Sequence, residues 1–294
     1  MDQYAGMMLP FRAYAKVNLT LEVLRRRPDG YHDIVSVMQT IDLADTLHFE
    51  PSDELELACY RSELATADNL VLKAARLLQE ATGCREGARI LLAKGIPVAA
   101  GLGGGSSDAA VTLLALNRLW RLGLTVAALT QVAAQMGSDV PFFLHGGIAI
   151  VSGRGDAVTP LPSLPETWLV VVRPPWEIPH KTQSLYAALE SSAFTDGEAS
   201  QRLARLIRDG QRLEASLLNN AFEGVASAVF PGLDDYRRYC LEEGAPNPCL
   251  AGSGPSLFVL AAGKEAGEGW RRRFAARGLE AYLARTVAGQ GIPP

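Results

Sequence analysis

A glycine-rich loop occupies residues 97–107 and reads Pro97-Val98-Ala99-Ala100-Gly101-Leu102-Gly103-Gly104-Gly105-Ser106-Ser107. The apolar pattern predicts a strand over 88–94 before it and a helix after it. Glycines lack the Cβ atoms that would keep a polyanion at a distance, and the amide hydrogens of such a loop can all point at phosphate oxygens. Ser106, Ser107 and Asp108 are expected to cap the following helix. The loop therefore predicts a phosphate site.

Neither of two common nucleotide motifs matches this loop. A dinucleotide fingerprint would have a glycine where Ser106 stands and an acidic residue after the helix, but residues 118–123 contain none. A Walker loop would continue from Gly105 into a lysine. A purely structural glycine turn stays an alternative, because small residues also suit tight helix packing. Any lysine for the phosphates must come from elsewhere in the chain.

Length and charge narrow the classes of protein that are possible. A chain of 294 residues is long enough for two domains, and we place the boundary in the Gly-, Pro- and Ser-rich stretch 152–166, which gives domains 1–160 and 161–294. With 28 basic and 32 acidic residues, the formal charge of −4 provides no broad field for nucleic acid or an anionic membrane. We therefore expect a small-molecule ligand held by local geometry.

Two expectations rest on sequence patterns that this chain lacks: its cellular location and the role of its cysteines. Residues 1–10 lack the basic start and long apolar stretch of a signal peptide, and no apolar run reaches membrane-spanning length, so we expect a cytoplasmic protein. The cysteines are Cys59, Cys84, Cys240 and Cys249. Their spacing indicates neither a zinc site nor a disulfide framework.

The first fifty residues alternate in polarity as a strand and hairpin do. Residues 15–24 place Lys16 and Asn18 on one side of a strand, and the segment Arg27-Pro28-Asp29-Gly30 is a turn signal. Residues 69–82 and 126–136 are predicted helices. The second half opens with an apolar strand over 168–172, and a second glycine turn lies within 250–255. Lys16 and Asn18 are thus predicted to face the same space.

Three segments together resemble a known superfamily: Ala15-Lys16-Val17-Asn18, the 97–107 loop and Gly252-Ser253-Gly254. The superfamily comprises galactokinase, homoserine kinase, mevalonate kinase and phosphomevalonate kinase (GHMP kinases). Tyr31-His32 and Gly137-Ser138-Asp139-Val140-Pro141-Phe142 narrow the resemblance to the family that acts on 4-diphosphocytidyl-2-C-methyl-D-erythritol. The resemblance implies an α+β, two-domain GHMP kinase fold. Its N-terminal domain would be ribosomal-protein-S5-like and its C-terminal domain ferredoxin-like, with the active site between them.

The implied activity is transfer of the ATP γ-phosphoryl group to the 2-hydroxyl of the cytidyl-diphosphate methylerythritol, in the non-mevalonate route to isoprenoid precursors. On the family pattern Asp139 accepts the proton of the attacking hydroxyl, and Lys16 keeps that carboxylate ionised and helps to neutralise the phosphoryl group. Taken alone, Asp139 is better interpreted as a helix cap and Lys16 as a solvated strand lysine, and the resemblance reverses that preference. Phosphoryl transfer needs a positioned hydroxyl, an orienting carboxylate and positive charge.

The resemblance also implies binding residues. Tyr31 and Tyr186 would stack on the two faces of the cytosine, and His32 and Asn18 would form hydrogen bonds with the acceptor; a core aromatic is the alternative for Tyr186. The 97–107 loop would hold the ATP phosphates. The residues that would flank its adenine are Asn69, Leu70 and Lys94, with a helix cap, a core leucine and a strand-end lysine as their alternatives. Gly252, Ser253 and Gly254 would add amides from the acceptor side, or form an ordinary turn.

Cofactors and competing functions follow from the same resemblance. ATP is expected as co-substrate and Mg²⁺ as its countercharge, with unknown protein ligands. We expect a monomer or weak homodimer. A homoserine or mevalonate kinase would not need Tyr31-His32, and a non-catalytic nucleotide- or sugar-binding relative would not need both Lys16 and Asp139. An oxidoreductase that uses the loop for NAD is disfavoured by the missing acidic residue.

Overall fold

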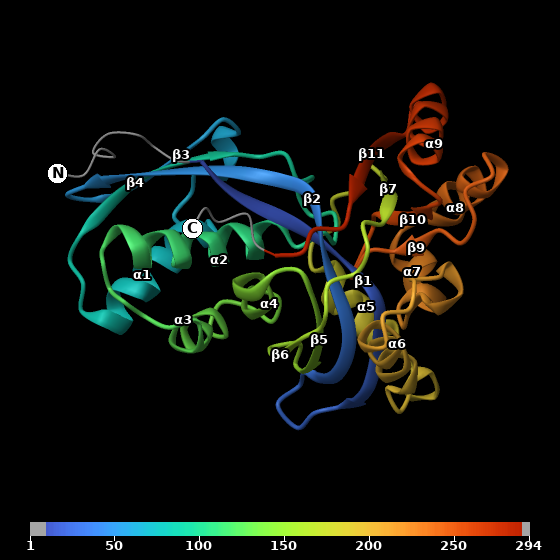
Figure 1. Ribbon diagram of the computed structural model, residues 1–294, viewed down its shortest axis with the longest axis horizontal. Coiled ribbons are helices and arrows are strands. Elements are labelled where there is room, and N and C mark those ends of the chain that lie inside the picture. Colours follow the sequence, from blue (N-terminus) through green and yellow to red (C-terminus); the bar gives the residue numbers. More distant parts are fainter. Residues whose placement is uncertain (1–9, 290–294) are drawn as a thin grey trace.

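The computed structural model describes residues 10–289, in which a long hairpin forms the centre of the molecule (Figure 1). Its strands are β1 (Phe11–Arg26) and β2 (His32–Ser52), and the predicted 27–30 turn joins them. They pair antiparallel from Phe11 with Leu47 to Arg26 with His32, with irregularities that include one between Asn18 and Thr20. Residues 1–9, on which part of the signal-peptide expectation rests, and the end of the predicted second domain lie outside the described residues.

Strand β2 is long enough to pair with two further strands along the edge that does not face β1. Its first half pairs with β5 (Ile148–Gly153), and its second half pairs with β4 (Gly87–Ala93), both antiparallel. The sheet is completed by β3 (Leu55–Cys59) beside β4 and by β6 (Ala157–Pro160) beside β5. The strand that feeds the glycine loop and the strand that carries Lys16 therefore belong to one sheet.

Four helices cover one face of this sheet (Figure 1). They are α1 (Leu70–Thr82), α2 (Gly104–Leu119), α3 (Val126–Ala133) and α4 (Val140–His145). Their buried apolar side chains, such as Leu78, Leu113 and Phe142, pack with Leu47 and Ile90 of the strands. Burial of each such side chain contributes about 1.5–3 kcal/mol, so the face is fixed firmly under the loop.

A second, four-stranded sheet lies in the C-terminal half of the described chain, in the order β11-β7-β10-β9. The strands are β7 (Trp168–Arg173), β9 (Cys249–Leu250), β10 (Leu257–Ala261) and β11 (Glu280–Arg285), and β7 pairs antiparallel with both β10 and β11. The helices are α5 (Lys181–Ala188), α6 (Glu198–Arg208), α7 (Glu223–Val229), α8 (Leu233–Glu242) and α9 (Lys264–Ala276). This strand order with α9 between β10 and β11 is the ferredoxin-like arrangement that the sequence predicted.

The two halves share a core and a strand. Leu169, Val171 and Phe258 of the second sheet pack with Val17 and Val37 of the first. Strand β8 (Asn219–Asn220), from the C-terminal half, pairs parallel with Thr20 and Leu21 of β1. The change of sheet between β6 and β7 is where the proposed boundary between 1–160 and 161–294 lies. A buried apolar interface of this kind fixes the position of the 97–107 loop relative to the 252–254 turn.

Several local predictions differ from the structure. Helix α2 begins at Gly104 with Gly103 as its N-cap, so Ser106, Ser107 and Asp108 lie inside the helix and do not cap it. The prediction failed because Gly103, in a left-handed conformation, is the N-cap, so the helix begins before the predicted capping residues. Helix α3 ends at Ala133 rather than at Met136, and parts of the 152–166 stretch belong to strands, with 152–153 ending β5 and 157–160 forming β6. No helix within residues 10–289 is both long and apolar enough to cross a membrane.

Candidate active site

The two glycine turns lie against each other and against Lys16. The Lys16 amide donates to the Leu102 carbonyl at 2.9 Å, which ties the 97–107 loop to β1. A Cβ on Gly101 would lie 2.2 Å from the Ala251 carbonyl oxygen, and one on Gly252 would lie 2.7 Å from Lys16 Nζ. Gly101 and Gly252 also have φ of +83° and +56°. Glycine is required here both for its left-handed backbone and for the close approach.

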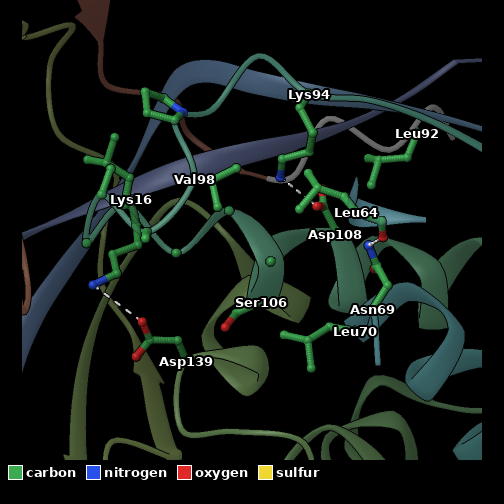
Figure 2. Close-up of a pocket in the computed structure, with 18 of the residues that line it drawn as sticks. Lys16, Leu64, Asn69, Leu70, Leu92, Lys94, Val98, Ser106, Asp108 and Asp139 are labelled. Atoms are coloured by element: carbon green, nitrogen blue, oxygen red, sulfur yellow. Dashed lines mark hydrogen bonds and ion pairs between the residues drawn. The ribbon is translucent and has the colours of Figure 1, made fainter. Parts of the chain in front are cut away.

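The glycine loop forms one wall of a cavity of about 520 Å³, which we call the loop cavity. Figure 2 shows Val98 and Ser106 on this wall, Leu70 and Asn69 at the far end, and Lys16 at the near end. Residues 97–106 of the predicted loop all line the cavity. Ser107 does not, because its side chain is fully buried within α2. The cavity is walled largely by backbone, which suits a ligand rich in acceptor oxygens.

A buried ion cluster supports the loop at its entry. Lys94 Nζ forms ion pairs with Asp108, at 2.8 Å, and with Asp45 of β2. The other Asp45 oxygen accepts the amides of Gly95 and Ile96 at 2.7 and 2.8 Å. Burial raises the pKa of the Asp108 carboxyl above its ordinary value, although Lys94 opposes the rise. Lys94 therefore lines the cavity while it anchors the loop to the sheet (Figure 2).

Asn69 and Leu70 stand where the sequence placed them, at the start of α1. The Asn69 side chain caps the helix by accepting the Val71 amide at 2.9 Å, and its amide donates to the Leu64 carbonyl at 2.8 Å. Both residues line the loop cavity at the end away from Lys16 (Figure 2). The cap and a ligand-binding role are thus compatible at Asn69.

Lys16 and Asp139 face each other where two cavities meet. Lys16 Nζ lies 3.3 Å from Asp139 Oδ2, and only 5% of the Lys16 side chain is exposed against 36% for Asp139. Lys16 Nζ also donates to Asn18 Oδ1 at 2.7 Å, and Asn18 donates to Ser36 Oγ at 2.8 Å. Asp139 precedes α4 but makes no capping hydrogen bond. The alternatives of a solvated lysine and a helix-capping aspartate are therefore wrong.

The second cavity, of about 750 Å³, is lined by aromatic rings and we call it the ring cavity. Tyr31 on the hairpin turn is 55% exposed, and the Arg154 guanidinium lies 5.2 Å from the centre of its ring. The rings of His32 and Tyr186 stack at 4.5 Å with an angle of 11°. Phe222 contacts the Tyr186 ring edge-on at 4.9 Å. Flat rings in this number suit a flat, unsaturated ligand.

Burial tunes the hydrogen-bonding character of the ring cavity. The pKa of His32 is lowered by burial and by the nearby Arg26 charge, so its imidazole is neutral at pH 7 and offers one donor and one acceptor. Burial and the Asp139 charge raise the pKa of Tyr186 to about 12, so its hydroxyl stays protonated. Together with Asn18, which also lines this cavity, these groups provide both donors and acceptors.

The loop cavity and the ring cavity share Lys16, Asp139 and Ser253. Ser253 belongs to the second glycine turn, and its hydroxyl accepts a hydrogen bond from Thr182 at 2.9 Å. Gly252 lines the ring cavity, whereas Gly254 lines neither and instead accepts a hydrogen bond from Lys181 through its carbonyl. Two ligands, one in each cavity, would thus approach each other beside Lys16 and Asp139.

Sequence reasoning missed two cations at these cavities. Lys181 lines the loop cavity and Arg154 lines the ring cavity. Arg154 stood in a stretch interpreted as a linker, and its position between Gly153 and Gly155 was the only local signal. Lys181 directly precedes Thr182, which lines the ring cavity. Neither residue belongs to the 97–107 loop or to the 252–254 turn, so only the fold brings them to the site.

Known proteins resemble this chain both in sequence and in structure. Residues 69–147 match the N-terminal domain of GHMP kinases. A protein of Dehalococcoides mccartyi strain CBDB1, named 4-diphosphocytidyl-2-C-methyl-D-erythritol kinase, is 44% identical over 95% of this chain and 99% of its own length. One of the same name from Pelotomaculum thermopropionicum is 41% identical over 95% of this chain and 98% of its own. The chain belongs to the 4-diphosphocytidyl-2-C-methyl-D-erythritol kinase family of GHMP kinases.

Solved structures agree with this family. A crystal structure of 4-(cytidine 5'-diphospho)-2C-methyl-D-erythritol kinase superposes with a TM-score of 0.79 at 35% identity, covering 95% of this chain and 99% of that one. Homoserine kinase from Cytophaga hutchinsonii superposes with a TM-score of 0.74 at 20% identity, covering 99% of this chain and 98% of that one, and so shares the fold. The family and the α+β GHMP kinase fold predicted from the sequence are confirmed.

Proposed function

We propose that this GHMP kinase transfers the γ-phosphoryl group of ATP to the 2-hydroxyl of 4-diphosphocytidyl-2-C-methyl-D-erythritol. The observation that carries the proposal is the meeting of the loop cavity and the ring cavity at Lys16, Asp139 and Ser253. A backbone-walled cavity suits a triphosphate, and a ring-lined cavity suits a cytosine. Their junction holds a carboxylate and a cation, which are the groups that phosphoryl transfer requires.

At the junction Asp139 accepts the proton of the acceptor hydroxyl as its oxygen attacks the γ-phosphorus. One O–P bond forms to that oxygen, and the bond from the γ-phosphorus to the bridging oxygen of ADP breaks. Lys16 lies 3.3 Å from Asp139 and is held by Asn18, so it stands where charge gathers on the transferring oxygens. General base catalysis of this kind contributes about 10²–10⁴-fold to the rate.

In the ring cavity the cytosine lies against Tyr31 on one side and the His32–Tyr186 pair on the other. Support comes from the stacking of His32 on Tyr186, which covers one face of Tyr186 and presents a paired aromatic wall. Neutral His32 and Asn18 then form hydrogen bonds with the acceptor. Arg154, beside the Tyr31 ring, provides positive charge on the side where a diphosphate would pass.

In the loop cavity the ATP phosphates bind backbone amides within 98–106, and Gly252 and Ser253 close the junction from the acceptor side. The adenine lies at the far end, near Asn69, Leu70 and Lys94. The start of α2 supports phosphate binding here. Its N-cap, Gly103, has no side chain to accept the first amides of the helix, so these amides are left for a ligand.

Magnesium would enter with the nucleotide rather than occupy a preformed protein site. Among residues 10–289 no group of three or more His, Cys, Asp or Glu side chains could hold a metal ion. Mg²⁺ commonly binds through one or two protein oxygens together with substrate phosphates, and the Ser106 hydroxyl lines the loop cavity as such an oxygen. When bound, the ion would offset the negative charge of the phosphates.

One assay tests the proposed reaction against its nearest alternatives. ADP release and phosphorylated product are measured side by side with the cytidyl-methylerythritol acceptor, homoserine and mevalonate. We expect equal amounts of ADP and phosphorylated product with the cytidyl acceptor, and background rates with the other two. Comparable turnover of homoserine or mevalonate, or ADP release without a phosphorylated cytidyl product, would reject the proposal.

A further inference from the structure

Lys181 reaches the loop cavity from an unexpected direction. It is the first residue of α5 and comes from the C-terminal half of the chain, whereas the rest of the cavity is built almost entirely from residues before 140. The preceding residue, His180, has a left-handed backbone with φ of 54°. Such a conformation is costly for a residue with a Cβ, and it turns the chain sharply at this point. The start of α5 is therefore held in an unusual geometry beside the cavity.

Among the residues that the structure describes, the charge of Lys181 has no counter-charge. Its ammonium donates to the Gly254 carbonyl, and among the described residues no carboxylate lies within ion-pair distance of it. The other two lysines of the cavity differ: Lys16 pairs with Asp139, and Lys94 pairs with Asp45 and Asp108. A half-buried cation that only a neutral carbonyl contacts is poorly stabilised, so it favours an anionic ligand.

The electrostatics of the loop cavity also favour an anion beside Lys181. Burial and the charge of Lys16 lower the pKa of Lys181 to about 7. The helix dipole also disfavours a cation at the first position of α5. An anion placed between Lys16 and Lys181 would remove the mutual repulsion of the two ammonium groups.

We infer that Lys181 is a second catalytic cation, which binds the γ-phosphate of ATP opposite Lys16 and stabilises it during transfer. The inference rests on the proposed function and assigns the side chain that completes its phosphate site. On ATP binding the Lys181 ammonium exchanges the Gly254 carbonyl for γ-phosphate oxygens. As the bond to the bridging oxygen breaks and the bond to the acceptor oxygen forms, the two lysines hold the transferring group between them.

The position of Lys181 also relates the two cavities. Its neighbour Thr182 lines the ring cavity and donates to Ser253, which lines both cavities. Lys181 and Thr182, which are adjacent at the start of α5, therefore line the proposed ATP side and the proposed acceptor side, respectively. This arrangement places Lys181 at the γ-phosphate end of the loop cavity and not at the adenine end.

The test measures binding of a non-hydrolysable ATP analogue and of ADP to the full-length protein and to K181M, each with Mg²⁺. A charge-assisted hydrogen bond to the γ-phosphate predicts that K181M binds the ATP analogue about ten- to a hundredfold more weakly, while ADP binding changes less than about twofold. K181R, which keeps the charge, should recover part of the loss. K264M, on α9 and outside both cavities, is the matched lysine control.

Equal weakening of both nucleotides in K181M, or no weakening of either, would overturn the role of Lys181. Thermal unfolding of K181M and K181R identifies a folding defect. If K181M does not fold, K181R decides the question: a folded K181R that does not prefer the ATP analogue over ADP, as the wild type does, would equally overturn the role of Lys181. These binding measurements need no acceptor. If the wild type binds ATP but does not phosphorylate the cytidyl acceptor, the proposed function fails while the ATP-to-ADP comparison still decides Lys181.

Discussion

The loop cavity and the ring cavity are built in different ways. The loop cavity is walled mainly by one continuous segment, 97–106, whose backbone amides and glycines form the surface. The ring cavity is assembled from side chains of separate segments, including Tyr31, Arg154, Tyr186 and Phe222. Backbone donors recognise phosphates that all nucleotides share, whereas rings and neutral hydrogen-bonding groups recognise one base. The difference suggests that the choice of acceptor resides in the ring cavity.

The largest effect is expected where the two cavities meet. Asp139→Asn removes the proton acceptor but keeps the size of the side chain, so kcat should fall by about 10²–10⁴-fold while both substrates bind within about tenfold of wild type. The measurement is steady-state ADP release together with calorimetric binding of each substrate. Near-normal turnover would show that Asp139 is not the base.

A smaller effect, confined to the loop cavity, is expected for Gly101→Ala. The added Cβ would meet the Ala251 carbonyl at 2.2 Å and the φ is +83°, so the two glycine turns must separate. We expect a loss of about 2–4 kcal/mol in the free energy of unfolding and at least tenfold weaker ATP binding.

Gly123→Ala is the matched control for this change. Gly123 has φ of +66° but open space around its Cβ, so it should lose only about 1–2 kcal/mol and leave ATP binding unchanged. Equal effects of the two substitutions in thermal unfolding and ATP titration would mean that contact between the turns is unimportant.

Tyr31→Ala tests the ring cavity alone. Loss of a stacking ring, worth about 1–3 kcal/mol per base, should raise the KM of the cytidyl acceptor about five- to a hundredfold with little change in the KM of ATP. Tyr31→Phe should retain the wild-type value. Tyr60→Ala, which removes a tyrosine that is 80% exposed and outside both cavities, should have no effect on either KM. If the KM of ATP rose in parallel, the separation of the two cavities would be wrong.

The smallest predicted effect concerns pH. Burial and the Lys16 charge lower the pKa of Lys181 to about 7, so its charged form, which we infer to bind phosphate, predominates below that pH. The kcat/KM for ATP should therefore fall as pH rises, by about fivefold between pH 7 and pH 8. Lys16 is the charged group that acts on it, and His180 is the titratable residue next to it in the chain.

Two variants assign this profile. K181R should flatten it, because the guanidinium stays charged throughout the range. His180→Asn should leave the fall in place, since asparagine tolerates the left-handed backbone and the titrating group is retained. Persistence of the same fall in K181R would assign the profile to another group.

The sequence predicted the parts of the site that depend on local order. The glycine loop, the hairpin turn before Tyr31, and the shared face of Lys16 and Asn18 all follow from contiguous residues, and the structure places them accordingly. The start of α2 was misplaced, because Ser106, Ser107 and Asp108 are residue types that commonly cap helices, whereas the helix already begins at Gly104 with Gly103 as its cap.

What could not be predicted depends on contacts between distant segments. Asp45 and Asp108 become partners of Lys94 only when β2 and α2 pack around the loop entry. Arg154 and Lys181 lie in unremarkable local sequence, and they reach the cavities through the β5–β6 turn and the start of α5. The stacking of His32 on Tyr186 likewise joins residues far apart in the chain. No periodicity or short motif encodes such pairs.

The most direct test of the account is a crystal structure of the protein with a non-hydrolysable ATP analogue and the cytidyl-methylerythritol acceptor bound together. We predict the triphosphate against Gly101 and Gly103, the cytosine between Tyr31 and the His32–Tyr186 pair, and the acceptor 2-hydroxyl beside Asp139. A cytosine bound in the loop cavity, or two ligands that compete for a single cavity, would contradict the account.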